Sequence, residues 1–114
     1  MKLKQVVEVL ELKVCVGGEG LDKEVEGGYV SDLLSDVIAN SQRGDIWITL
    51  QVHQNIVAIS VLKELAGIIV IGGKEPTEET LSKAKEEKVV IITSRLSAFE
   101  LCGRLYEMGL RGRE

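Results

Sequence analysis

Two unbroken apolar runs constrain the fold of this chain more than any other feature. Residues 68–71 read Ile-Ile-Val-Ile and residues 89–92 read Val-Val-Ile-Ile, with no polar side chain in either run. A strand presents successive side chains to opposite faces of its sheet, so an unbroken apolar run predicts a strand that is covered on both faces. Parallel sheets flanked by helices bury their strands in this way. The two runs therefore predict inner strands of a parallel sheet.

Helical and strand patterns alternate in the first part of the chain. Apolar residues at helical spacing open it, and residues 12–16 then alternate as a strand. A second, shorter strand is predicted at residues 24–26, where it runs into Gly27 and Gly28, and the sequence leaves its direction open. Ser31 or Asp32 then caps a helix, because a short polar side chain at this point satisfies free backbone donors.

The same alternation continues through the rest of the chain. Residues 46–50 form an apolar strand pattern, and residues 55–65 predict a well-buried helix that is apolar on most sides. A later helix carries Pro76 in its first turn, and Ser97 and Glu100 have the spacing of a capping box. Strands that alternate with helices predict an α/β three-layer sandwich. In this fold a mostly parallel sheet of about five strands is flanked by helices on both faces.

Length, charge and composition limit the classes of function. The chain has 114 residues, enough for one domain, which we assign to residues 1–110 with a disordered tail at residues 111–114. Its net charge of −4 and its one Trp, one Phe and two Tyr residues argue against binding of nucleic acid. No apolar run approaches the roughly 20 residues of a membrane span, so no membrane association is expected. Because no signal-peptide pattern opens the chain, we expect a cytoplasmic location.

Polar residues and glycines are concentrated where each predicted strand ends and the next helix begins. In a parallel sheet these carboxyl ends share one edge, and ligands bind in the crevice outside it. The candidate ligand-binding residues are Gly27, Gly28, Ser31, Asp32, Thr49, Gln51, His53, Asn55, Gly72, Gly73, Thr93 and Ser94. Glycines let a ligand approach the backbone, and helix N-termini offer N–H donors to a phosphate, nucleotide or carboxylate. Paired glycines also serve plain turns, so an anion site and a simple turn remain alternatives.

No catalytic or metal-binding constellation is complete in the sequence. His53 is the only histidine, no carboxylate stands near it in sequence, and no spacing supplies further metal ligands. The phosphate loop of nucleotide-hydrolysing enzymes is missing. Cys15 and Cys102 lie far apart in apolar surroundings, which predicts inert thiols. We therefore assign no catalytic residue, no metal site and no cofactor. The sequence leaves enzymatic activity open but favours a non-enzymatic function.

Four segments resemble a DRTGG domain, and the resemblance covers nearly the whole chain. They are residues 27–32 (Gly-Gly-Tyr-Val-Ser-Asp), residues 49–55 (Thr-Leu-Gln-Val-His-Gln-Asn), residues 69–76 (Ile-Val-Ile-Gly-Gly-Lys-Glu-Pro) and Phe99-Glu100. The chain is particularly similar to small stand-alone DRTGG proteins that are labelled HPr-kinase-like and are encoded beside iron-only hydrogenase subunits. The resemblance implies the fold of the N-terminal domain of HPr kinase/phosphorylase. It also implies dimerisation and regulation, as in certain pyrophosphatases with CBS modules. The family's Thr-Gly-Gly stands here as Ile71-Gly72-Gly73, and its Asp-Arg pair is replaced within residues 50–53.

Three functional hypotheses result. The first is a non-catalytic regulatory or ligand-sensing domain, a homodimer that binds a small anionic metabolite or nucleotide at the carboxyl edge of the sheet. The alternative is an interaction or accessory protein for a redox enzyme complex of the hydrogenase type, with no small-molecule ligand. A small enzyme that uses His53 with Ser31, Asp32 or Thr93 ranks last, because proton transfer requires partners within hydrogen-bond reach.

Overall fold

A computed structural model describes residues 1–112, which form five α-helices, one short 3-10 helix and a five-stranded sheet. The α-helices are α1 (Leu3–Val9), α2 (Leu34–Asn40), α3 (Asn55–Lys63), α4 (Glu78–Glu87) and α5 (Ala98–Glu107). The strands are β1 (Lys13–Val16), β2 (Gly27–Val30), β3 (Asp45–Thr49), β4 (Gly67–Val70) and β5 (Ile91–Thr93), and the 3-10 helix is η1 (Gly18–Gly20). No helix among the described residues is both long and apolar enough to cross a bilayer.

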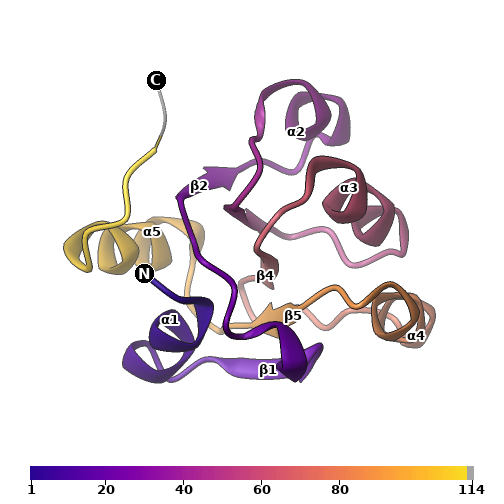
Figure 1. The fold of residues 1–114 in the computed structure, drawn as a ribbon, viewed down its shortest axis with the longest axis horizontal. Helices are drawn as coiled ribbons and strands as arrows, with labels where there is room; N and C mark the ends of the chain where they lie inside the picture. Colours follow the sequence, from indigo (N-terminus) through magenta and orange to yellow (C-terminus); the bar gives the residue numbers. More distant parts are fainter. Residues whose placement is uncertain (113–114) are drawn as a thin grey trace.

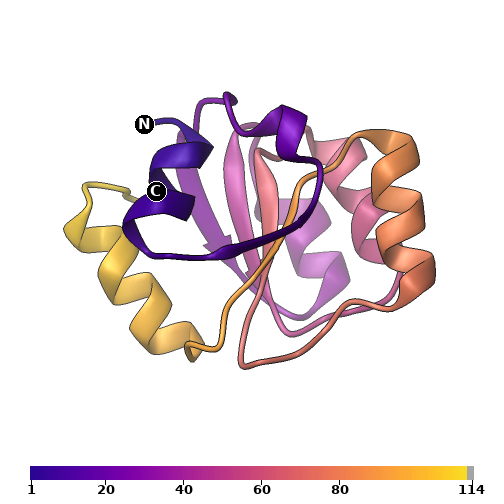
Figure 2. The same ribbon diagram turned by 90° about the horizontal axis from the view of Figure 1, so that it is seen from below.

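The sheet is mostly parallel, as the sequence predicts. Its strand order is β1-β5-β4-β3-β2, so β1 and β2 are the edge strands. Strands β2, β3, β4 and β5 run parallel, whereas β1 pairs antiparallel with β5. Helices α1 and α5 cover one face of the sheet, and α2, α3 and α4 cover the other (Figures 1 and 2). The predicted α/β three-layer architecture is therefore confirmed.

Alternation along β4 explains why its sequence is apolar without a break. Ile69, and Ile71 just after the strand, belong to the core cluster that contains the buried residues of α1 and α5. Ile68 and Val70 belong to the cluster on the opposite face, with the buried residues of α2, α3 and α4. Because both faces are covered by helices, every side chain of the strand is buried.

The second short strand lies later in the chain than predicted. Residues 24–26 do not form β2, because their backbone pairs with other segments: Val25 N–H donates to the Met1 carbonyl and Glu26 N–H to the Gly44 carbonyl. The strand instead begins at Gly27 and runs parallel to β3, which settles its direction. The two glycines expected to stop a strand are thus its first two residues.

The start of α2 also differs from the prediction. Neither Ser31 nor Asp32 caps the helix; the N-cap position is held by Leu33, without a side-chain hydrogen bond. The Ser31 hydroxyl accepts the N–H of Leu33 at 3.1 Å, which forms a turn ahead of the helix. The Asp32 carboxylate points instead to the segment that follows β3.

The remaining helices agree with the sequence in position but not in every detail. Helix α3 is less buried than predicted: Val61 and Leu62, at its outer side, are exposed, because one sheet face covers only one side of it. Pro76 precedes the N-cap residue Thr77 of α4 rather than lying in the first turn. Ser97 caps α5 as predicted by accepting the N–H of Glu100 at 3.3 Å.

A polar group joins β2 to α2 on the outer surface. The Tyr29 hydroxyl donates to the Asp36 carboxylate at 2.8 Å, and the Asn40 amide donates to the same group at 2.9 Å. Hydrogen bonds from Asn40 and then Tyr29 stabilise the ionised carboxylate and lower the pKa of Asp36. The same hydrogen bond to Asp36 raises the pKa of Tyr29.

Replacement of Tyr29 by Phe is expected to lower the Tm at neutral pH, and by less in acid. The pKa of Asp36 in the folded protein lies below its ordinary value of 3.8, so its contribution to stability is present above that pH. It is lost as the pH falls through the lowered pKa. Thermal unfolding at pH 7 and at about pH 2.5 tests this. Ser82→Ala, which removes the hydroxyl of an exposed serine of α4, is the control. A Tm difference that stays constant or grows on acidification would contradict the prediction.

Candidate functional site

The carboxyl ends of four parallel strands meet at one edge of the sheet. The segments that follow β2, β3, β4 and β5 all leave from this edge. Strand β1 runs the other way, so its first residue, Lys13, also lies here and pairs with Thr93 at the end of β5. This edge divides into a closed half around β2 and β3 and an open half around β4, β5 and β1.

Three of the predicted site residues, Asp32, Thr49 and Gln51, close the first half by bonding to one another, and Ser31 is held beside them by Trp47. Asp32 accepts a hydrogen bond from the Thr49 hydroxyl at 2.8 Å and from the Leu50 N–H at 2.7 Å. The Gln51 amide donates to the Asp32 carbonyl at 2.8 Å, and the indole N–H of Trp47 donates to the Ser31 carbonyl at 2.9 Å. These hydrogen bonds join residues 31–32, after β2, to residues 47–51, at the end of β3 and just after it. They give the polar side chains of this half a structural role.

His53 and Asn55 lie at the same edge, at the start of α3, and both are exposed. Among residues 1–112 the His53 imidazole makes no hydrogen bond or ion pair, so no carboxylate orients it as a general base. Its segment is tied to α4 through the Val52 carbonyl, which accepts from the Thr77 N–H at 3.1 Å and the Thr80 hydroxyl at 2.7 Å.

Gly27 and Gly28 do not join this edge. They are the first residues of β2, and they pair with Asp45 and Ile46 at the start of β3. Because parallel strands start together at the opposite edge of the sheet, the two glycines lie at the amino edge. Their predicted place beside the other site residues was wrong, since the strand begins at the residues that were expected to end it.

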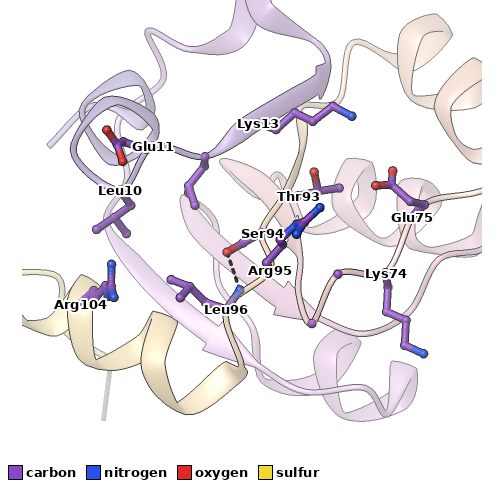
Figure 3. Close-up of a pocket in the computed structure, with 13 residues that line it drawn as sticks. Leu10, Glu11, Lys13, Lys74, Glu75, Thr93, Ser94, Arg95, Leu96 and Arg104 are labelled. Carbon is purple, nitrogen blue, oxygen red and sulfur yellow. Dashed lines mark hydrogen bonds between the residues drawn. The ribbon is translucent and has the colours of Figure 1, made fainter.

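An open hollow of about 740 Å³ occupies the second half of the edge (Figure 3). We call it the carboxyl-edge hollow. It lies between the start of β1, the turn after β4 and the segment after β5. Four of the predicted residues line it: Gly72, Gly73, Thr93 and Ser94. The others were not predicted: Leu10, Glu11, Leu12, Lys13, Lys74, Glu75, Arg95, Leu96 and Arg104.

The paired glycines shape the rim of this hollow, but their N–H groups are not free for an anion. Gly72 and Gly73 have φ of 68° and 74°, in the left-handed region that glycine adopts readily. Their N–H groups donate to the carbonyls of Leu96 at 2.9 Å and Ser94 at 3.1 Å. The turn after β4 is thereby tied to the segment after β5. Recognition of an anion must therefore come from side chains.

The side chains of the hollow carry an excess of positive charge. Four cationic residues line it against two carboxylates, Glu11 and Glu75. Arg104 is paired with Glu100 at 3.4 Å. The other three, Lys13, Lys74 and Arg95, make no ion pair within residues 1–112. The hollow is thus suited to attract an anion, whereas it contains no arrangement of acid, base and nucleophile.

Only two of these four cationic residues could have been found from the sequence, because they stand next to predicted site residues. Lys74 and Arg95 directly follow the predicted residues Gly73 and Ser94. Lys13 and Arg104 reach the hollow through the antiparallel direction of β1 and the path of α5, which no local pattern indicates.

The cysteines and acidic residues offer no further chemistry in the described part of the chain. No group of three or more His, Cys, Asp or Glu residues there is placed to hold a metal ion. Burial raises the pKa of Cys102, which disfavours its reactive thiolate.

Replacement of Asp32 by Ala is expected to lower the free energy of unfolding by about 1–2 kcal/mol. The change leaves the Thr49 hydroxyl and the Leu50 N–H without their partner. Urea denaturation measures the effect. Asp22→Ala removes another exposed aspartate, whose side chain makes no hydrogen bond within residues 1–112, and should change stability by less than about 0.5 kcal/mol. Equal stability of the two variants would mean that the Asp32 bonds contribute nothing.

Comparisons with known proteins support the fold. No protein-family model matches the chain, and no curated protein matches it in sequence. Among solved structures, it is similar to the crystal structure of the CBS and DRTGG domains of the regulatory region of Clostridium perfringens pyrophosphatase, complexed with the activator diadenosine tetraphosphate. The TM-score is 0.68 at 21% identity, and the match covers 96% of this chain and 47% of that chain. This chain therefore spans about half the length of its structural neighbour (47%) and shares with it a DRTGG-like fold.

Proposed function

We propose that this chain is a non-catalytic, ligand-sensing domain that binds a small anionic metabolite or nucleotide at the carboxyl edge of the sheet. The observation that carries the proposal is the carboxyl-edge hollow, where Lys13, Lys74 and Arg95 line the wall and make no ion pair with any residue of 1–112. Its volume of about 740 Å³ falls within the range of small-molecule sites, about 300–1,000 Å³. The neighbouring fold, in a regulatory region complexed with a nucleotide activator, is in keeping with this role.

The arrangement of polar groups favours binding over turnover. His53 lies outside the hollow, and the Ser31, Asp32 and Thr49 side chains are used in hydrogen bonds within the protein. A sensor needs only an affinity that differs between two states of its complex or assembly. We propose a cytoplasmic location as well, where phosphorylated metabolites are abundant.

Calorimetric titration of the protein with adenine nucleotides, acyl phosphates and pyrophosphate tests the proposal. We expect at least one of these to bind with a Kd below about 1 mM at low salt. Binding should weaken when the salt is raised to about 0.5 M, because the cations are exposed and screened. No binding heat across the panel at millimolar ligand would overturn the proposal.

A matched pair of glycine variants locates the binding. Gly73→Asn adds a side chain at a position where a Cβ has no neighbour within 4 Å, and asparagine tolerates the positive φ. Gly109, with φ of 103° and equally open surroundings, gives the control Gly109→Asn away from the hollow. Only the first variant should lose affinity.

We also propose that two copies associate through an apolar surface formed by the edge strand β2 and helix α5. We call this surface the α5 face; it consists of Val30, Phe99, Cys102 and Tyr106, which line an apolar hollow of about 560 Å³. Phe99 is 89% exposed and Tyr106 is 59% exposed. Large aromatic side chains left in water favour association, and a two-fold axis would bring each α5 face against its own copy.

Sedimentation equilibrium tests the homodimer. The protein should dimerise with a Kd below about 50 μM, and Phe99→Asp should yield a monomer. Because Phe99 is so exposed, this change should leave the folded chain intact. Leu62→Asp, at an exposed position of α3, is the matched control and should remain a dimer. A wild-type monomer would contradict the homodimer. It would favour the alternative, an accessory protein whose α5 face binds a redox enzyme complex.

A further inference from the structure

The two ends of the carboxyl-edge hollow differ in chemistry. Figure 3 shows Lys13, Arg95 and Lys74 on the side of the β1 start and the turn after β4, together with Glu75. That end has three cations against one carboxylate. On the other side, next to α1 and α5, lie the apolar side chains of Leu10 and Leu96, together with Glu11 and Arg104. Since Arg104 is paired with Glu100, that end has no excess of positive charge.

Hydroxyl groups in the wall add donors for an anion. Thr93 is 7% exposed, and yet it lines the hollow. The Ser94 oxygen accepts the N–H of Leu96 at 3.1 Å, which leaves its own O–H free to donate. Ser94 directly precedes Arg95, and all three residues line the hollow, so an oxyanion placed there would meet charged and neutral donors together.

The size of the hollow leaves room for a ligand larger than an inorganic anion. A volume of about 740 Å³ is several-fold more than a bare phosphate or pyrophosphate needs. A ligand that fills it must bring a second part, and Leu10 and Leu96, at the end next to α1 and α5, provide a surface for an apolar or aromatic group. The exposed carboxylate of Glu11 at that end would accept hydrogen bonds from an amino group.

We infer that the ligand class of this site is a nucleoside phosphate, bound in one orientation. Its phosphates lie at Arg95, Lys13 and Lys74, and its base lies on Leu10 and Leu96. This inference rests on the proposed function, and it adds the class of ligand, its orientation and the role of Arg95.

Titration with ATP and with tripolyphosphate tests the two-part ligand, because the two probes share the phosphate chain and only ATP carries a base. ATP should bind at least ten-fold more tightly than tripolyphosphate. In spectra of protein with labelled leucine methyl groups, Leu10 and Leu96 should shift with ATP and not with tripolyphosphate. Arg95→Gln should lower the affinity for both probes at least five-fold. Arg43→Gln, which removes one charge at the amino edge of the sheet, should change either affinity less than two-fold.

The outcomes separate this inference from the proposed function. Equal affinity for the two probes would contradict a nucleoside phosphate as the ligand class, and it would remain consistent with the proposed anion-sensing function. Binding of ATP with shifts confined to residues 49–55 would overturn the assignment to the hollow and keep a ligand at the carboxyl edge. Absence of binding by both probes and by every other compound of the panel would overturn both. Because Arg95 is exposed and pairs with no carboxylate in the part of the chain that the structure describes, loss of folding is not expected, and circular dichroism of Arg95→Gln checks this.

Discussion

Burial of the inner strands on both faces is the constraint on which the rest of the structure depends. Ile68, Ile69, Ile91 and Ile92 are fully buried, and each such side chain contributes about 1.5–3 kcal/mol relative to an exposed one. A single exposed hydrogen bond at the sheet edge contributes about 1 kcal/mol. The apolar strands therefore determine the fold, and they oblige helices to cover both faces. Polar segments are left to the edges, where they close one half of the carboxyl edge and leave the other open.

The open half exists because β1 runs against its neighbour. A parallel strand beside β5 would send another strand-to-helix segment out of the carboxyl edge. Here the short connection from α1 enters β1 at that edge instead and brings Leu10, Glu11 and Lys13 to it. The hollow is bounded by this connection on one side and by the glycine turn after β4 on the other. The N–H groups of the glycines donate to neighbouring backbone carbonyls, so the groups that the hollow presents are mainly side chains.

The α5 face and the carboxyl-edge hollow both include residues of helix α5. Arg104 lines the hollow, whereas Phe99, Cys102 and Tyr106 form the α5 face. Under the two proposals made above, ligand binding and association would share this helix, and a shift of α5 would alter both. A regulatory domain requires such a coupling free energy between two sites.

The sequence by itself determined the sandwich, the parallel inner strands and the positions of most helices, because apolar periodicity directly reports which faces are buried. It also located Gly72, Gly73, Thr93 and Ser94, which directly follow unmistakable strands. It misplaced Gly27 and Gly28, since nothing local reveals that residues 24–26 bond to Met1 and Gly44 rather than to β3. The tertiary structure alone decided that Asp32 bonds to Thr49, that His53 stands outside the hollow, and that Lys13 and Arg104 line it. Those relations join residues distant in the sequence, and strand order and direction, which set them, leave no trace in local patterns.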